Sequence, residues 1–342
     1  MSKVIGPRLL KTLVADIGGT NSRLAVAITS RKEPQIDLTN VVKFNNSDFK
    51  NFEEIIAKYL STRDGLEINR MCVAAAGIVS KTTVDMSNLN WKITVSSLQT
   101  AANVEKVFII NDLQAQGYAL DFINPKDLEK LIDGSHSTSE SDTKLVCGMG
   151  TGFNVAIAYK TPFGTFVPAS EYGHARITVA NEKQNFIIKH LEKNSPFVSY
   201  EHILAGLGLN RLDQILNQID DRSPADILAA AEAGDLQAKE VGNQLAGFAG
   251  QAFGDFALMN MALGGVYLIG GVARAMMPYL KKDNFKKNFY QRGQFSEIMK
   301  KISVQVILDD FAALKGCANY STILSGEKNF IPTNIKKLEI TK

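Results

Sequence analysis

The sequence has few cysteines and no long apolar stretch. Its three cysteines are Cys72, Cys147 and Cys317, and none forms a C-x-x-C pair. So small and odd a set argues against a disulfide framework or a zinc cluster and favours a reducing compartment. No apolar run approaches the roughly 20 residues that span a bilayer, and charges interrupt the N-terminal segment where a secretory signal would lie. We therefore expect a cytoplasmic protein without a membrane partner.

The sequence also lacks a large excess of positive or negative charge. Lys and Arg number 38, Asp and Glu number 35, and the net charge is +3. The basic residues are dispersed, whereas nucleic-acid-binding proteins gather them on one face or segment, so we expect no nucleic-acid partner. With 45% hydrophobic and 21% charged residues, the composition is that of a globular protein, and 342 residues suggest two domains.

Two glycine-rich turns join predicted strands to predicted strands. The first, Gly18–Asn21 (GGTN), lies between apolar segments at 12–17 and 22–28, and the second, GMGTG at 148–152, lies between two more such segments. Rossmann and P-loop fingerprints need a helix after the glycines, so both are disfavoured. The repetition predicts a duplicated architecture in which both turns face one cleft.

Glycine turns of this kind suit phosphate. Without a Cβ, backbone N–H groups can approach an anion closely, and Thr20 and Thr151 add hydroxyl donors at equivalent places. Asp16, just before the first turn, is a hard oxygen ligand that could hold Mg²⁺ directly or through water. The alternative is that both turns are ordinary hairpins.

Asn111 and Asp112 follow the apolar strand predicted at 107–110. Ligands collect at the carboxyl ends of strands in α/β sheets, and an Asp there could accept the proton of an attacking hydroxyl. The alternative reading is a helix N-cap, for which Asp is favoured.

Glu171, His174 and Glu201 are polar groups that suit the closely spaced hydroxyls of a sugar. A zinc site is an alternative, although Glu-x-x-His without further ligands is weak support for metal. A surface loop at 171–174 and a helix start at 201 are the remaining alternative. Helical patterns at 243–263 and 312–324 complete the prediction of an α/β class with mixed sheets.

These motifs together resemble the bacterial glucokinases, which belong to the superfamily of sugar kinases, actin and heat-shock ATPases. The resemblance spans residues 12–325, and its segments come in the family's order: LVADIGGTNSRLAV (13–26), IINDLQA (109–115), GMGTG (148–152), SEYGHA (170–175), VSYEHILAGLGL (198–209) and GGV (270–272). It implies a two-domain actin-like ATPase (ribonuclease H-like) fold with mixed sheets flanked by helices and a cleft between the domains. The implied domains are residues 1–112 with 312–326, and residues 113–311.

The implied activity is phosphorylation of the glucose 6-hydroxyl by ATP with Mg²⁺, in a homodimer. Asp112 would be the base. The sugar hydroxyls would bind Asn88, Asn111, Asp112, Glu171, His174 and Glu201. The nucleotide would bind Asp16 (through Mg²⁺), Gly18, Gly19, Thr20, Asn21, Gly150, Thr151, Gly152 and, at the adenosine, Gly270 and Gly271.

Three positions depart from the family pattern. Phe153-Asn154 stands where Leu-Gly is usual, Tyr172 where Gly is usual, and Gly77 where Pro is usual. These changes bear on rate and sugar choice, with a side chain after Gly152 expected to crowd the nucleotide. They keep two alternatives open: a non-catalytic sugar sensor or regulator on the same fold, and a kinase for another hexose. A protein-binding ATPase of actin or chaperone type is a third, against which the sugar-binding set argues.

Overall fold

The computed structural model describes residues 9–30, 35–63, 65–80, 82–86, 89–135, 142–162 and 164–324. These residues group into two compact units. The first comprises the described residues up to Phe122, then Lys160–Val167 and those from Asp310 onward; the second comprises Ile123–Tyr159 and Pro168–Asp309. Helix 112–119 thus groups with the first unit, and the predicted domain limits at residues 112 and 311 stay predictions.

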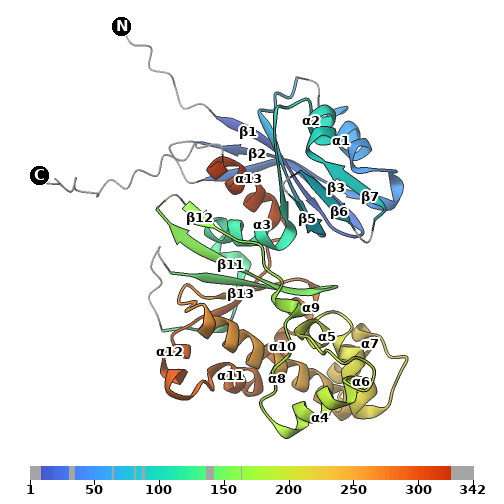
Figure 1. Cartoon of the computed structure of the whole chain (residues 1–342), viewed down its shortest axis with the longest axis vertical. Helices are drawn as coiled ribbons and strands as arrows, with labels where there is room; N and C mark the ends of the chain where they lie inside the picture. The colour runs from blue at the N-terminus through green and yellow to red at the C-terminus, as the bar shows by residue number, and fades with distance from the viewer. Residues whose placement is uncertain are drawn as a thin grey trace, which may run out of the picture. The chain divides into compact units, whose positions relative to one another are not determined.

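The first unit is built on a five-stranded mixed sheet (Figure 1). In sheet order the strands are β3 (Ile36–Asn45), β2 (Asn21–Thr29), β1 (Leu10–Ile17), β4 (Arg70–Ala75) and β8 (Lys106–Asn111). The first three strands are antiparallel, and β1, β4 and β8 run parallel. Every residue of β4 is buried, as expected for a strand covered on both faces. The parallel strands therefore end at one edge of the sheet, where Asp16 and Asn111 lie.

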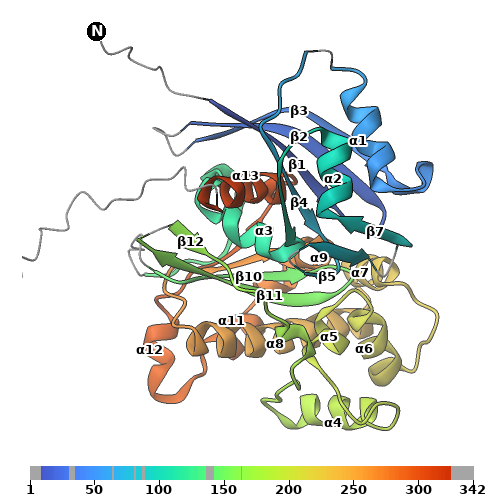
Figure 2. The same cartoon turned by 45° about the horizontal axis from the view of Figure 1, so that its top comes forward.

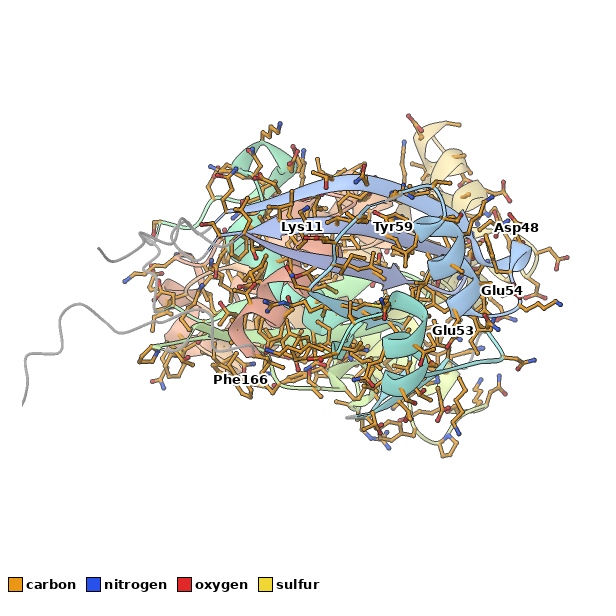
Figure 3. All side chains as sticks on the ribbon, turned by 90° about the horizontal axis from the view of Figure 1, so that it is seen from above. Lys11, Asp48, Glu53, Glu54, Tyr59 and Phe166 are labelled. Atoms are coloured by element: carbon orange, nitrogen blue, oxygen red, sulfur yellow. The ribbon has the colours of Figure 1, made fainter. Side chains whose placement is uncertain are left out.

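Helices cover both faces of this sheet (Figure 2). Helices α1 (Phe52–Leu60) and α2 (Val95–Ala102) pack on one face, and α3 (Asp112–Ala119) and α13 (Ala312–Leu324) lie on the other. Figure 3 shows α1 with Glu53 and Glu54 in its first turn and Tyr59 farther along the helix. A small antiparallel sheet of β5 (Ile78–Val79), β6 (Thr83–Met86) and β7 (Trp91–Thr94) leads into α2.

The crossing of α3 and α13 is unusually close. A Cβ on Gly316 of α13 would overlap the carbonyl oxygen of Ala115 on α3. Asn319 also donates through Nδ2 to the Tyr118 carbonyl at 2.8 Å. The late helix α13 therefore fixes the position of α3, which begins with Asp112.

The second unit repeats the arrangement of a hairpin beside parallel strands. Its strands belong to a six-stranded sheet with the order β12 (Gly164–Phe166), β11 (Phe153–Thr161), β10 (Lys144–Met149), β13 (Val266–Ile269), β14 (Val304–Ile307) and β9 (Leu128–Ile132). The residues of β12 and the last two of β11 are grouped with the first unit. Strands β10 and β11 form the antiparallel hairpin, and β10, β13 and β14 are parallel. The predicted duplication is thus visible in the two sheets.

The helices of this unit surround α8 (Leu236–Met259), which carries the buried Phe248, Phe253 and Phe256. The others are α4 (Glu182–Leu191), α5 (Tyr200–Leu204), α6 (Gly208–Asn217), α7 (Pro224–Glu232), α9 (Gly271–Ala275), α10 (Met277–Leu280), α11 (Asp283–Tyr290) and α12 (Ser296–Met299). Short 3₁₀ turns occur in both units: η1 (Asn46–Asp48) and η2 (Leu120–Phe122) in the first, and η3 (Pro125–Asp127), η4 (Tyr172–His174) and η5 (Gly293–Phe295) in the second. The predicted α/β class with mixed sheets is confirmed.

The three cysteines are free and buried. Across the part of the chain that the structure describes, none of the helices has both the length and the apolar character needed to cross a bilayer.

Candidate active site

The first glycine turn is a tight connection between β1 and β2. The Gly18 N–H donates to the Asn21 carbonyl at 3.0 Å, and Ile17 and Ser22 form the last pair of the strand register. Gly19 and Thr20 are exposed at the tip. Backbone donors and the Thr20 hydroxyl are thus presented to solvent on a turn held by its own strands.

A buried asparagine from another strand end supports this turn. Asn46 is 2% exposed, donates through Nδ2 to the Gly18 carbonyl at 2.9 Å and accepts from the Ser22 hydroxyl at 2.7 Å. Its own N–H donates to the Thr20 carbonyl at 2.9 Å. Sequence reasoning missed Asn46, because it lies 28 residues from the turn that it supports and forms no local motif.

Asp16 combines burial with an ion pair. Arg23, its partner in the strand register, places Nη1 3.2 Å from Asp16 Oδ2. Burial raises the pKa of Asp16 to about 6; Arg23 opposes the rise and the charge of Asp112 adds to it. The strand registers place Asp16 and Asn111, the residue before Asp112, at the same end of the sheet.

Asn111, rather than Asp112, caps α3. The Leu113 N–H donates to Asn111 Oδ1 at 3.0 Å and to Asp112 Oδ1 at 2.8 Å. Gln114 Oε1 accepts from the Asn111 N–H at 3.2 Å, which completes a capping box. Burial raises the pKa of Asp112, while hydrogen bonds from the Leu113 N–H and the Asn111 side chain oppose that rise. Asp112 is therefore a fixed carboxylate, made more basic by burial, at the start of a helix.

The second glycine turn lies in the other unit. The Gly150 N–H donates to the Gly152 carbonyl at 3.0 Å, and Thr151 and Gly152 are exposed. A Cβ on Gly150 would meet nothing within 4 Å. The backbone at this turn therefore faces open space, as a phosphate site requires.

Gly270 and Gly271 adjoin that turn. Gly270 has φ +110°, and a Cβ there would overlap the Met149 carbonyl oxygen. A Cβ on Gly271, in contrast, would lie in open space. The first glycine is needed for close packing of backbone against backbone, and the second leaves room beside it.

Glu201 contacts the same turn from α5. Its Oε2 accepts from the Phe153 N–H at 3.2 Å and lies 3.2 Å from the place a Cβ on Gly152 would occupy. Glu201, a residue expected to bind the sugar, therefore contacts the turn that is expected to bind phosphate, although it lies 48 positions from Phe153 in the sequence.

Glu171 and His174 lie on the exposed η4 loop. The His174 N–H donates to the Glu171 carbonyl at 3.2 Å, which closes the loop into a 3₁₀ turn. Burial and the charge of Arg211 lower the pKa of His202 on α5. Glu171, His174 and Glu201 lie in the same unit as the second turn.

The first unit holds most of the remaining candidate site residues. Asp16, the turn at 18–21, Asn111 and Asp112 belong to the first unit, and Asn88 lies outside the described residues. Within the described ranges no group of three or more His, Cys, Asp or Glu side chains could hold a metal ion. This finding gives the zinc alternative at Glu171, His174 and Glu201 no support.

Comparison with known proteins decides the family. Residues 13–323 match the glucokinase family. The chain is 31% identical over 316 residues to a glucokinase of Chelativorans sp., covering 90% of both chains. The chain belongs to the glucokinase family. This confirms the resemblance and the predicted enzyme class, an ATP-dependent hexose kinase.

Solved structures agree with this assignment. A glucokinase from an Antarctic psychrotroph is 29% identical with a TM-score of 0.83, covering 91% of this chain and 98% of that one. A glucokinase from Streptomyces griseus, solved with glucose and AMPPNP, is 18% identical with a TM-score of 0.60, covering 91% of this chain and 98% of that one. The second likeness shows the fold alone, which is the predicted sugar-kinase fold.

Two of the departures from the glucokinase pattern are absorbed by packing. Phe153 is 2% exposed and stacks on Phe253 of α8, with ring centroids 6.1 Å apart. Tyr172 packs edge-on against Phe256, with centroids 5.2 Å apart. The ring of Phe153 is therefore buried in the core of its unit, and the expectation that a side chain after Gly152 crowds the nucleotide stays a prediction.

Proposed function

We propose that this glucokinase-family chain transfers the γ-phosphoryl group of ATP to the 6-hydroxyl of glucose. The observation that carries the proposal is the Asp112 carboxylate, fixed at the start of α3 at the same end of the sheet as the first glycine turn. A hexose kinase needs an acceptor for the hydroxyl proton beside its phosphate site. The solved relative from Streptomyces griseus, crystallised with glucose and AMPPNP, supports both ligands by analogy.

In this proposal Asp112 accepts the proton of the 6-hydroxyl as the oxygen attacks phosphorus. The raised pKa of Asp112 makes it a stronger base than an exposed carboxylate, while its hydrogen bonds hold the carboxylate in place. In a loose phosphoryl transition state orientation counts for more than basicity, so the Asn111 contact to Asp112 matters as much as the pKa.

The sugar hydroxyls bind Glu171, His174 and Glu201, with Asn111 and Asn88 as further partners. Glu171 and His174 are exposed on their loop, so their polar atoms are accessible to a ligand. One carboxylate can accept from two neighbouring hydroxyls, which matches the spacing of a hexose.

The phosphates bind the backbone of the two glycine turns. Gly18, Gly19, Thr20 and Asn21 supply donors from one unit, and Gly150, Thr151 and Gly152 from the other. Gly270 and Gly271 lie beside the second turn, where the adenosine is expected. The open space beside Gly150 and Gly271 supports this assignment.

Asp16 fits the Mg²⁺ that accompanies ATP. It is a hard oxygen donor, and Arg23 contacts only its Oδ2 at 3.2 Å while burial raises its pKa to about 6, so a cation beside it would relieve an unfavourable charge. When bound, Mg²⁺ would neutralise charge on the phosphates. We propose that Asp16 holds it through water.

A coupled assay of ADP release tests the function. With MgATP we expect turnover with glucose and little with mannose or glucosamine, and none after EDTA. Turnover on another hexose alone would make the chain a kinase for that sugar. Glucose binding by calorimetry without turnover would make it a sensor, and ATP hydrolysis without sugar would make it an ATPase.

We also propose a cytoplasmic location and a homodimer. The location rests on the few cysteines and the lack of a long apolar run, and the homodimer rests on the family likeness. Light scattering should give a mass about twice the 37.4 kDa of the chain, and a mass near 37.4 kDa would refute the dimer.

A further inference from the structure

Asn154 stands where the glucokinase pattern has glycine, and both polar atoms of its side chain form hydrogen bonds. Its Nδ2 donates to the Ser170 carbonyl at 2.7 Å and to Glu171 Oε2 at 3.1 Å. Its Oδ1 accepts from the Val155 N–H at 2.8 Å and from the Gly173 N–H at 3.4 Å. One side chain on β11 therefore contacts Ser170, Glu171 and Gly173 of the loop that carries Glu171 and His174.

These contacts join two parts of the proposed site. Asn154 is two residues beyond Gly152, so it belongs to the strand that leaves the second glycine turn. The loop is pressed against the same strand, because a Cβ on Gly173 would overlap the Phe153 carbonyl oxygen. Ser170 adds a second tie, donating through its hydroxyl to the Val155 carbonyl at 2.6 Å.

The contact to Glu171 differs in kind from the others. The other hydrogen bonds hold backbone groups, but this one holds the carboxylate of an exposed side chain. Without that bond, the Glu171 side chain could adopt several rotamers. An amide donor on one oxygen selects a rotamer and leaves the other oxygen for a ligand. Glycine at position 154 has no donor with which to do this.

We infer that Asn154 is a positioning residue that orients Glu171 and thereby sets the affinity for the sugar. The inference rests on the proposed role of Glu171 in binding glucose. Because ordering one side chain before binding is worth about 3- to 10-fold in affinity, we expect an effect of that size. The effect falls on sugar binding, since Asn154 contacts the sugar loop and not the tip of the glycine turn.

Two substitutions separate the roles of Asn154. Asn154→Gly restores the family residue and removes all four side-chain contacts. Asn154→Asp keeps the shape and the acceptor of the Val155 and Gly173 N–H groups, but it faces both the Glu171 carboxylate and the Ser170 carbonyl with an oxygen in place of Nδ2. We expect the glucose Kd, measured by calorimetry without nucleotide, to rise about 3- to 10-fold with Gly and at least as much with Asp.

The matched control is Ser170→Ala. It removes a tie between the same loop and the same strand without touching the Glu171 carboxylate. A loop that merely needs tethering would weaken glucose binding equally in this variant, whereas orientation of Glu171 predicts a glucose Kd close to that of the unchanged enzyme. Thermal melts of all variants identify any that fail to fold.

A double-substitution cycle decides the matter. In a Glu171→Gln background, Asn154→Asp should weaken glucose binding less than it does in the unchanged enzyme, and in the single variants at position 154 KM for ATP and kcat should stay within about twofold. An unchanged glucose Kd in the single variants, an equal rise in both KM values, or a full effect in the Glu171→Gln background would overturn the inference. An unsubstituted enzyme that neither binds nor phosphorylates glucose would instead refute the proposed function itself.

Discussion

Arg23 Nη1 lies 3.2 Å from Asp16 Oδ2 across the pair formed by β1 and β2. The pair does not restore Asp16 to ordinary behaviour, because burial outweighs Arg23 and raises the pKa to about 6. The protein thus keeps a carboxylate where it lowers the stability of the fold, as binding sites often do.

This shift predicts how stability depends on pH. The native carboxyl binds its proton up to pH about 6, whereas the unfolded one releases it near its ordinary value of 3.8. The free energy of unfolding should therefore fall, through this group, as pH rises from about 4 to 6 and then level off. Asp16→Asn should raise it by about 1–3 kcal/mol at pH 7.5 in EDTA, and by less at pH 4.

Urea unfolding at the two pH values checks this. The control is Asp37→Asn, an exposed acid on strand β3 of the same sheet, which should change little at either pH. Loss of stability at pH 7.5 in Asp16→Asn would mean that Arg23 outweighs burial after all.

Alanine should have different effects at Gly150, within the second turn, and at Gly270, beside it: the first should impair ATP binding and the second should lower stability. Gly150→Ala adds a methyl group in open space, so the free energy of unfolding should change by less than about 0.5 kcal/mol while KM for ATP rises more than about tenfold. Gly270→Ala meets the Met149 carbonyl at φ +110° and should cost about 1–3 kcal/mol of stability. Denaturant unfolding together with ATP kinetics measures both. A stable Gly150→Ala enzyme with normal KM for ATP would remove this turn from the nucleotide site.

Asn46 predicts a remote effect on the first turn. Asn46→Ala leaves the Gly18 carbonyl and the Ser22 hydroxyl without their partner, so stability should fall by about 1–3 kcal/mol. KM for ATP should rise severalfold while the glucose Kd is unchanged. Asn45→Ala, at the exposed neighbouring residue that only caps η1, is the control and should alter neither. Equal effects on ATP and glucose would assign Asn46 to the fold alone.

The sequence could predict the parts of the site that are local in the chain. Each glycine turn joins two strands that follow one another, so turn chemistry and strand pattern suffice to place Gly18 and Gly150. The position of Asp112 at a strand end follows for the same reason. The cap of α3 was harder, because Asn111 and Asp112 are both favoured N-cap residues and only the backbone decides between them.

Contacts between distant residues could not be predicted. Asn46 and Asn154 bind backbone carbonyls and a carboxylate far along the chain, and such bonds leave no periodicity in the sequence. The predicted limits of the long buried helix, 243–263, are also wrong, because α8 spans Leu236–Met259. The helix begins earlier than predicted because Asp235 caps a polar first turn that carries no apolar pattern.

The role of Asp112 is the central claim, and one comparison tests it most directly. Asp112→Asn keeps the size of the side chain but removes the proton acceptor. We predict that calorimetry finds its glucose Kd within about fivefold of the unchanged enzyme, while the rate of glucose 6-phosphate formation falls by about 10²–10⁴. A variant that binds glucose and phosphorylates it at the full rate would contradict the account.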